Sequence, residues 1–448
     1  MLRLLHLLIV VTYLVLPAAV VGAILLKRRR SRNGAAAGAA GPAATSETTD
    51  PASALGSIAV TFVAALAIAV SLCLIYARAS DGHVPLTQML LATYFAAGLL
   101  LILRGFDAAV IWLLRYVLWL HRPGAPTVAR GARIFTLYIA RTVILIAFGL
   151  PYVMAVVMTY RPKVFPRDNP QTQLGFKFER VEFTASDGTR LSGWWIPAAL
   201  QAPPRRRNPA AAPPSAERGQ NTVILCHGLA ASKSNQLILG RRLVPGGFNV
   251  LAFDFRAHGE SGGQLTSFGA IEKRDVLAAV RWVRENHPQE AHKIFGVGAS
   301  MGGAALIAAA ADPSAEGQAI DAVATYAAYD DLDLLVHDVS KEYFERPLGW
   351  VLEHVGVPIA SAHTGVNLTA FAPAREVSNV WPRPILYIHG KQDEIIPFAR
   401  GENLFDFTSQ PKYHLWYPKG AHNDIVADEA AAAIVAEFFR TAKSVPVI

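Results

Sequence analysis

Residues 298–302 read Gly-Ala-Ser-Met-Gly and fit the pattern G-x-S-x-G, with Ser300 at its centre. The short apolar run 293–297 before the pattern is typical of a buried strand, and the alanine-rich run 303–311 after it favours a helix. A serine on such a tight turn has a strained backbone and an exposed hydroxyl, and the flanking glycines avoid collisions with the neighbouring strand and helix. The pattern therefore predicts an α/β fold with Ser300 as a nucleophile. The alternative is a glycine-rich turn whose serine only caps the helix.

A nucleophilic serine needs a base, and the base needs an acid that orients it. With this kind of turn, the expected chain order is Ser, then Asp or Glu, then His. Residues 384–388 read as a strand, and Asp393 follows in the loop at its carboxyl end, where α/β sheets place functional groups. Residues 414–417 read as the last strand, and His422 follows before an alanine-rich final helix. The sequence therefore predicts Asp393 as the acid and His422 as the base.

Other residues compete for these two roles. His389 is the nearest rival of His422, but it precedes the turn and is expected to pack at the strand end. Glu394 is a weaker rival of Asp393. Three further acidic rivals follow the preceding strand, namely Asp330, Asp331 and Asp333.

Two backbone amides are candidates for an oxyanion hole. The apolar strand expected at 222–226 ends in His227, Gly228 and Leu229. The backbone N–H of Leu229 and that of Met301 could converge on a developing oxyanion. His227 itself is expected to shape this loop rather than to take part in the chemistry.

Residues 181–436 resemble a serine hydrolase of the α/β-hydrolase superfamily, in particular its membrane-anchored lipase-like branch and the serine aminopeptidase-like (S33) hydrolases. Besides Ser300 and the loops of Asp393 and His422, the matching stretches are FTASDGTRL at 183–191, His227-Gly228, and FDFRAHGES at 253–261. The chain departs from the family pattern at Ala299, often His, Tyr or Glu, and at Ala257, commonly glycine. The dehalogenase and epoxide-hydrolase branches are disfavoured because they place Asp at the position of Ser300.

The resemblance implies a doubly wound α/β-hydrolase fold with a mostly parallel sheet and a helical lid, and Ser-His-Asp chemistry without metal or organic cofactor. It does not specify the substrate. For the segment 254–261, the resemblance implies a structural turn after a strand, in which Arg256 and Asp254 hold the loop by a charge-assisted hydrogen bond. His258 lies in the same turn and is not expected to be catalytic.

The catalytic domain is expected to span residues 161–448. The Pro-, Arg- and Ala-rich insert at 201–220 is predicted to be a disordered surface loop. Residues 332–372 interrupt the alternation of strands and helices, with helical patches at 334–344 and 348–355, and are predicted to form the lid. The apolar residues of the lid are consistent with a small-molecule acyl substrate, but burial against the core would account for them equally well.

Composition indicates a membrane portion in addition to one large domain, because 52% of the residues are hydrophobic and only 17% are charged. The formal net charge of +8 is confined to residues 1–160, which carry 13 Lys+Arg and 4 Asp+Glu, whereas the remaining residues carry 29 and 30. The basic excess therefore flanks apolar segments, as it does next to a lipid bilayer, and does not indicate nucleic-acid binding.

Residues 1–160 are predicted to contain about four transmembrane helices, at 2–26, 55–77, 86–103 and 134–160. A cleaved signal peptide is the alternative for the first segment. The segment 106–120 is only about 22 Å long as a helix and contains Arg115, so an interfacial or re-entrant helix is expected there.

Positive charge near short spans stays on the cytoplasmic side, so the basic clusters at 27–32 and 104–133 are predicted to be cytoplasmic. Four spans then place the catalytic domain on the extracytoplasmic side, with the bacterial inner membrane as the expected location. A crossing by 106–120 would place the domain inside.

The expected function is that of a membrane-anchored serine hydrolase that cleaves carboxylic esters, lipid esters and thioesters included, through an acyl-enzyme intermediate. The first alternative is a serine peptidase or aminopeptidase. The second is a catalytically silent hydrolase fold that serves as a membrane scaffold, against which the complete set Ser300, His422 and Asp393 argues.

Overall fold

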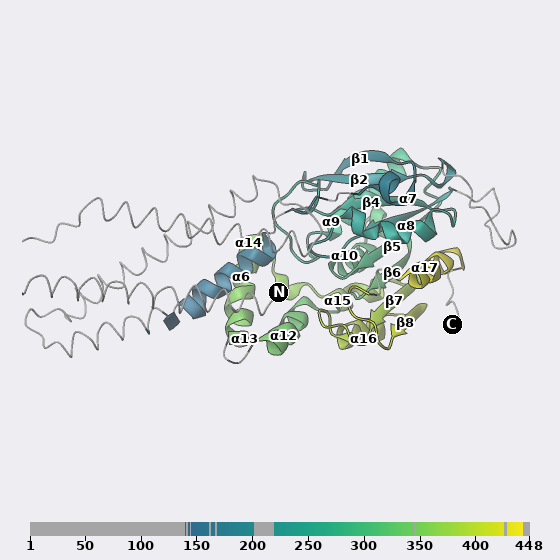
Figure 1. Cartoon of the computed structure of the whole chain (residues 1–448). Helices are drawn as coiled ribbons and strands as arrows, with labels where there is room; N and C mark the ends of the chain where they lie inside the picture. The colour runs from purple at the N-terminus through teal and green to yellow at the C-terminus, as the bar shows by residue number, and fades with distance from the viewer. Residues whose placement is uncertain are drawn as a thin grey trace, which may run out of the picture. The chain divides into compact units, whose positions relative to one another are not determined.

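The computed structural model describes residues 139, 142–143, 145–160, 163–165, 168–200, 219–344, 346, 348–424 and 428–441 (Figure 1). The predicted segments 2–26, 55–77, 86–103 and 106–120 and most of the insert 201–220 lie outside these residues. The described part of the predicted span 134–160 is helical and comprises the π-helix η2 (Leu145–Gly149) and α6 (Leu150–Thr159). None of the helices in the described ranges combines the length and apolar character that a bilayer crossing requires.

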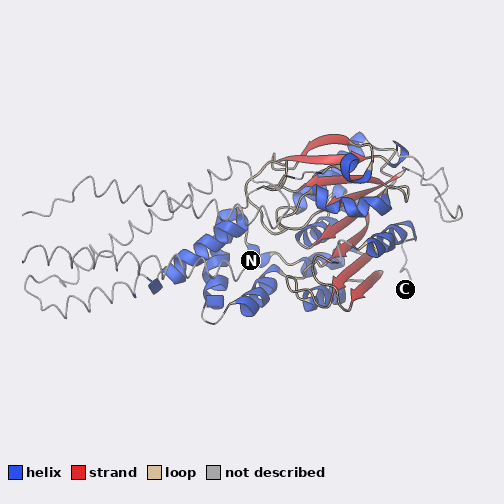
Figure 2. Ribbon diagram, viewed as in Figure 1, coloured by secondary structure: helices blue, strands red, loops and turns tan. Residues whose placement is uncertain are grey.

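The centre of the fold is a sheet of eight strands in the order β1-β2-β4-β3-β5-β6-β7-β8 (Figure 2). β1 (Glu179–Thr184) and β2 (Arg190–Ile196) form an antiparallel hairpin, and β2 pairs antiparallel with β4 (Asn249–Asp254). The remaining pairs are parallel and involve β3 (Asn221–Cys226), β5 (Lys293–Ala299), β6 (Ile320–Tyr326), β7 (Ile385–Gly390) and β8 (Lys412–Tyr417). The mostly parallel α/β-hydrolase sheet predicted from the sequence is confirmed.

Helices cover both faces of the sheet, which explains why its central strands are almost continuously apolar. One face packs against α9 (Lys273–Asn286), α10 (Met301–Ala310) and α16 (Phe398–Phe407). The other face packs against α8 (Leu237–Leu243) and α17 (Glu429–Thr441). Shorter helices connect these elements: α7 (Pro170–Leu174), η3 (Ala198–Leu200), η5 (Lys233–Gln236), α11 (Ala315–Gln318), α15 (Pro373–Glu376) and η8 (Val377–Val380).

The final helix illustrates how sequence pattern determines local structure. Its buried residues Ala431, Ala432, Val435, Ala436, Phe438 and Phe439 recur at helical spacing and form one apolar face. Glu429 at its start and Arg440 in its last turn complement the helix dipole. The alanine-rich helix predicted after His422 is therefore present, and it holds β7 and β8 from one side.

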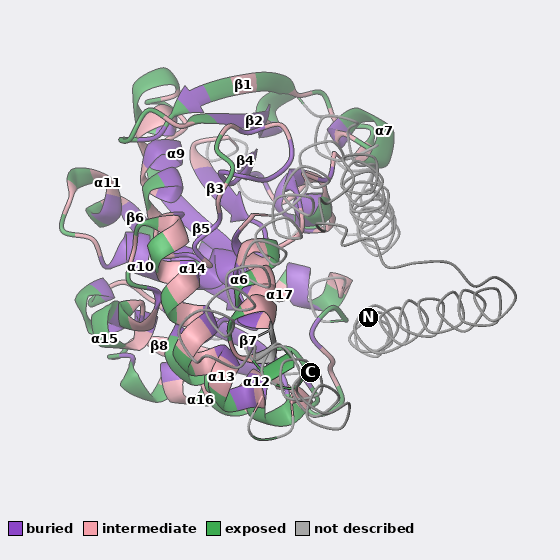
Figure 3. Ribbon diagram, turned by 90° about the vertical axis from the view of Figure 1, so that its left-hand side faces the viewer, coloured by how far each residue is buried: buried purple, intermediate pink, exposed green. Residues whose placement is uncertain are grey.

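A group of helices lies at the carboxyl end of the parallel strands. We call it the cap, residues 332–370; it comprises α12 (Leu332–Tyr343), α13 (Leu348–Val351), the π-helix η6 (Leu352–Gly356), α14 (Val357–Thr364) and η7 (Leu368–Ala370). The second helical patch predicted from the sequence thus continues from 355 to 364. Figure 3 looks onto this end of the molecule, where α14 packs against α6. Leu332, Leu335 and Leu368 are buried in an apolar cluster beneath the cap, so packing accounts for these residues.

Candidate active site

Ser300 lies between β5 and α10 in a strained backbone conformation, with φ 53° and ψ −121°. Positive φ is uncommon for a residue with a side chain and persists only where the surroundings hold it. Here the Ser300 N–H donates to the carbonyl of Tyr326 at 2.7 Å, and the Ser300 carbonyl accepts from the amides of Gly303 and Ala304. The strand–turn–helix predicted from the G-x-S-x-G pattern is therefore present.

The two glycines of the pattern are required by close approach of the backbone. A Cβ on Gly298 would lie 2.5 Å from the carbonyl oxygen of Gly302 in α10. A Cβ on Gly302 would lie 2.3 Å from the carbonyl oxygen of Cys226 in β3. Both distances are too short for non-bonded atoms, so side chains there would collide with the neighbouring helix and strand, as predicted. The close approach also places the start of α10 against the end of β3.

Asp393 and His422 lie together. Ser300 follows β5, Asp393 follows β7 and His422 follows β8, so all three are at the carboxyl edge of the parallel strands. The Nδ1 atom of His422 is 2.7 Å from Oδ2 of Asp393. An ionised carboxylate only accepts hydrogen bonds, so Nδ1 carries the proton and Nε2 is left free to act as a base.

The environment of Asp393 keeps its carboxyl group ionised. Burial acts to raise its pKa, but the rings of His389 and His422 and the amide of Ile396 outweigh burial and hold the pKa well below its usual range. The second oxygen, Oδ1, accepts from the amides of Ile395 at 2.9 Å and Ile396 at 2.8 Å. A fixed, ionised carboxylate of this kind can orient an imidazole and stabilise its cation.

The acidic rivals have other partners. Asp330 accepts from Arg400 and from Asn403, each at 3.2 Å. Asp331 caps α12 through the amides of Asp333 and Leu334 and also pairs with Arg375. The side chains of Asp333 and Glu394 are exposed. Of the acids weighed from the sequence, the structure brings Asp393 alone into contact with His422.

His389 packs at the strand end, as expected, but β7 extends two residues further than predicted and includes it. Its Nε2 donates to the carbonyl of Ile396 at 3.0 Å and lies 3.4 Å from Oδ2 of Asp393. Sequence reasoning missed this contact with the acid. The signal that could have found it is the spacing of four residues across the tight turn.

The two candidate oxyanion amides lie next to the turn that carries Ser300. Leu229 lies in the loop after β3, and Met301 is the first residue of α10. Within the part of the chain that the structure describes, neither N–H donates a hydrogen bond to a carbonyl or side chain. The loop is next to the nucleophile, because a Cβ built on Gly228 would lie 3.5 Å from the Cβ of Ser300. Met301 contributes in addition the positive end of a helix dipole.

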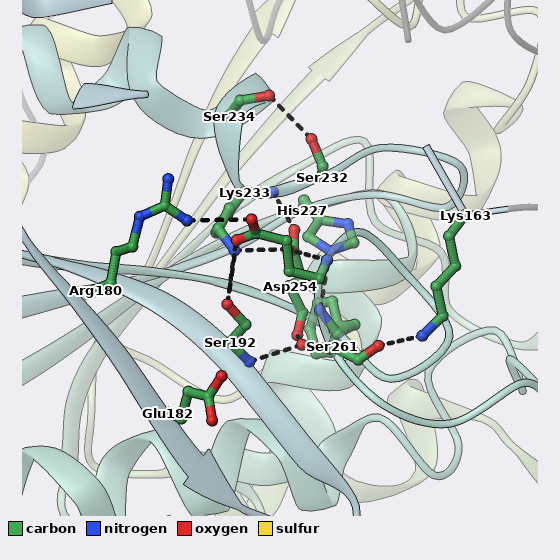
Figure 4. Close-up of polar contacts among 12 residues, drawn as sticks. Lys163, Arg180, Glu182, Ser192, His227, Ser232, Lys233, Ser234, Asp254 and Ser261 are labelled. Atoms are coloured by element: carbon green, nitrogen blue, oxygen red, sulfur yellow. Dashed lines mark hydrogen bonds and ion pairs between the residues drawn. The ribbon is translucent and has the colours of Figure 1, made fainter. Parts of the chain in front are cut away.

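A buried ion cluster holds the far end of this loop (Figure 4). The Lys233 ammonium is fully buried and donates to Asp254 at 2.8 Å, to Glu260 at 2.6 Å and to the Ser192 hydroxyl at 3.0 Å. The backbone N–H of Lys233 donates to the other oxygen of Asp254 at 2.7 Å. Removal of one partner from a buried pair typically costs about 3–5 kcal/mol because it leaves an uncompensated charge. The sequence analysis missed Lys233, and no local pattern marks it as buried.

The pairing of Arg256 with Asp254 inferred from the sequence is wrong. The Arg256 guanidinium donates to Asp275 on α9 and to Asp187 in the β1–β2 turn, each at 2.6 Å. Asp254 is the last residue of β4 and forms an ion pair with Lys233. Arg256 lies beyond the end of the strand and pairs with Asp275 on α9. The segment is nevertheless a structural turn, as expected.

Two neutral histidines fix the backbone of the loop. Nε2 of His227 accepts from the amide of Phe255 at 3.0 Å, so its Nδ1 carries the proton and donates to the carbonyl of Gly228 at 2.8 Å. His258 likewise accepts from the amide of Ala230 at 3.3 Å and donates to the carbonyl of Arg256. Burial, together with the nearby His258, lowers the pKa of His227 to about 3. These contacts fit the structural roles expected for both histidines.

The lowered pKa of His227 predicts a loss of stability in mild acid. Because the pKa is about 3 in the folded chain and ordinarily 6.5, the unfolded chain binds more protons between these values, and stability falls as the pH falls through this window. From pH 7 to pH 5 the free energy of unfolding should drop by about 2 kcal/mol through this group. Denaturant unfolding of the full chain in detergent at both pH values measures the drop. His227→Gln, which keeps an acceptor for Phe255, should show a smaller drop; an equal drop would contradict the assignment.

Comparisons with known proteins find one matching family model and several related sequences. Residues 217–359 match the family model described as serine aminopeptidase, S33. This match includes Ser300 and ends before Asp393 and His422. The chain is 29% identical over 251 residues to the uncharacterized protein YfhR of Escherichia coli O157:H7, covering 56% of this chain and 75% of YfhR. It is 31% identical over 206 residues to the uncharacterized protein YqkD of Bacillus subtilis, covering 45% and 65% of the two chains.

Among solved structures, an esterase from Pyrococcus furiosus matches 63% of this chain and 97% of its own, with a TM-score of 0.49 and 24% identity. The strand order, the turn at Ser300 and the family match at 217–359 agree with the resemblance stated from the sequence. The chain therefore has the α/β-hydrolase fold and resembles the serine hydrolases of that superfamily, including the S33 aminopeptidase-like group.

Proposed function

We propose that this chain is a membrane-anchored serine hydrolase that cleaves carboxylic esters through an acyl-enzyme intermediate. The observation that carries the proposal is the 2.7 Å pair of His422 and Asp393, which lies at the same sheet edge as the strained turn of Ser300. Strain of this kind is retained where it serves to expose a reactive group.

The proposed mechanism uses groups already described. The Ser300 hydroxyl attacks the ester carbonyl while Nε2 of His422 takes its proton, and the amides of Leu229 and Met301 hold the oxyanion. Collapse of the tetrahedral intermediate expels the alcohol, which receives the proton from His422 and leaves an ester on Ser300. Water then attacks that ester with His422 again as base, which releases the acid. Asp393 stays ionised throughout and orients the ring.

The anchor and the location are proposed from the sequence. Apolar segments and a basic excess in residues 1–160 support membrane attachment, and the positions of the basic clusters support an extracytoplasmic catalytic domain. An anchor of this kind places the site near lipids, which supports lipid esters and thioesters as candidate substrates.

Aminopeptidase activity is the second candidate, because the matching family model carries that description. An aminopeptidase needs an anionic group for the α-ammonium of its substrate. Of the three carboxylates that follow β6, Asp330 is paired with Arg400 and Asp331 with Arg375, and Asp333 is exposed in the first turn of α12. The arrangement therefore supports an ester substrate better than a peptide with a free amino terminus.

A panel of chromogenic substrates separates the candidates. The full chain in detergent should hydrolyse p-nitrophenyl esters. It should act on aminoacyl p-nitroanilides at least about 100-fold more slowly, because no carboxylate would form an ion pair with the α-ammonium group of the substrate. Faster cleavage of the anilides would support the aminopeptidase. Absence of any turnover, together with no reaction with a fluorophosphonate, would support the catalytically silent scaffold.

A further inference from the structure

An apolar surface extends from the last predicted span onto the cap. Phe148 in η2 and Trp350 in α13 are large apolar side chains that are more than half exposed, and Tyr152, four residues after Phe148, is exposed in α6. α13 and η6 lie against η2, and α14 lies against α6 (Figures 1 and 3). We call Phe148, Tyr152 and Trp350 the apolar surface. Exposed apolar groups on adjacent elements indicate a binding surface.

Charge is sparse in the part of the cap that carries Trp350. Residues 348–364, from α13 to the end of α14, contain a single Asp, Glu, Lys or Arg, which is Glu353. Its carboxylate lies 3.1 Å from Nδ1 of His337 and accepts from the Ser340 hydroxyl, both on α12. His354 stacks on Trp350 with ring centroids 4.6 Å apart. A segment of this length with one internally paired charge is suited to a lipid interface.

Contacts with η2 and α6 hold the cap beside the carboxyl-terminal part of the predicted span 134–160. α6 has ten residues and is about 15 Å long at 1.5 Å per residue. The cap contacts η2, the element before α6, so it runs beside the last 15 Å or so of the segment predicted to cross the bilayer. At the other end of α6, Thr159 bonds to His363 of α14 at 2.8 Å and accepts through its carbonyl from Thr266 at 2.8 Å. Helix, cap and catalytic core are thereby joined.

The cap is also in contact with the proposed catalytic loops. Its buried residues Leu335 and Ala360 share an apolar cluster with Ala304 of α10 and Ile396 of the Asp393 loop. The Tyr343 hydroxyl of α12 donates to the carbonyl of Glu394 at 2.8 Å. Apolar side chains therefore continue from the cap to the elements that carry Ser300 and Asp393.

We propose that the apolar surface, including Trp350 of the cap, is seated in the lipid bilayer and that the substrate is an amphiphilic ester that enters from the lipid phase. The substrate class rests on the proposed hydrolase function, whereas the seating of the cap does not. The bilayer is the occupant because the surface continues directly from the helix that the sequence predicts to be its last span.

Depth-dependent fluorescence quenching tests the seating. The full chain carries Cys73→Ser and Trp350→Cys and is reconstituted in liposomes. An environment-sensitive dye is attached to the cysteine at position 350, whereas the remaining Cys226 is buried and does not react. Trp381→Cys is the matched control, because Trp381 is also exposed but precedes β7 at the opposite, amino edge of the sheet. Lipid-borne doxyl groups should quench the dye at 350 and not at 381, and aqueous iodide should do the reverse. Iodide quenching at 350 as strong as at 381, or protection at 350 from both quenchers, would overturn the proposal.

Enzyme rates test the route of entry. Trp350→Ser should slow hydrolysis of an ester embedded in vesicles by on the order of 10-fold, since one aromatic side chain seated in the lipid is lost, and should leave a short soluble ester unaffected. Trp381→Ser should change neither rate. An equal loss on both esters with Trp350→Ser would overturn entry from the lipid phase. If the unaltered chain cleaved no ester, the proposed hydrolase function would fail, and the fluorescence result would still decide the seating.

Discussion

Ser300→Ala is expected to lower kcat for ester hydrolysis by on the order of 10⁵–10⁶-fold, because the nucleophile and its partners act as a unit. The substitution keeps the Cβ and the backbone hydrogen bonds to Tyr326, Gly303 and Ala304, so the turn should keep its conformation. The residual rate should reflect substrate binding and the oxyanion amides alone. Stopped assays with a p-nitrophenyl ester measure the loss, and the unfolding temperature controls for the fold. A loss below about 10-fold would contradict the role of Ser300.

Asp393→Asn is expected to lower kcat by on the order of 10⁴-fold. The asparagine oxygen can still accept from Ile395 and Ile396, but its amide would donate to Nδ1 of His422 and force the proton onto Nε2. The base would then be in the wrong tautomer for the reaction with Ser300.

Asp331→Asn provides the matched control for the acid. Asparagine is a good helix N-cap, so α12 should keep its start while the contact with Arg375 is weakened. Activity should change by no more than about 3-fold, because the Arg375 partner is largely exposed and Asp331 has no contact with His422. A larger loss in Asp331→Asn than in Asp393→Asn would move the acid to the end of β6.

The parts of the site that could be predicted depend on short-range constraints. The turn at Ser300 follows from steric constraints within one strand–turn–helix. Gly298 and Gly302 are needed there because a Cβ would lie 2.5 Å and 2.3 Å, respectively, from a backbone carbonyl oxygen. The proximity of Asp393 and His422 follows from topology, since the carboxyl ends of β7 and β8 adjoin in a parallel sheet. Their roles in catalysis remain predictions.

The parts that could not be predicted depend on long side chains that reach other elements. Arg256 does not pair with its near neighbour Asp254 but reaches α9 and the β1–β2 turn. The sequence around Lys233 has no pattern that distinguishes a buried ammonium from an exposed one. In the structure this ammonium donates hydrogen bonds to Asp254, Glu260 and Ser192, which come from three segments. Such pairings depend on tertiary distances that local periodicity does not contain.

The ends of helices and strands were harder to predict than their existence. β7 continues through His389 because its pairing with β8 extends to Gly390, which no change in hydrophobic pattern announces. The second helical patch of the cap extends to Thr364 because Gly365, with φ 74°, ends α14, although the apolar pattern weakens earlier.

Covalent labelling of the full chain with a fluorophosphonate, followed by mass-spectrometric mapping, tests the central claim most directly. The reagent phosphonylates only a serine that has an activating base and an oxyanion site. We predict a single adduct on the peptide that contains Ser300, and no adduct in Ser300→Ala. An unlabelled protein, or an adduct on another residue that persists in Ser300→Ala, would contradict the assignment of this chain as a serine hydrolase that acts through Ser300.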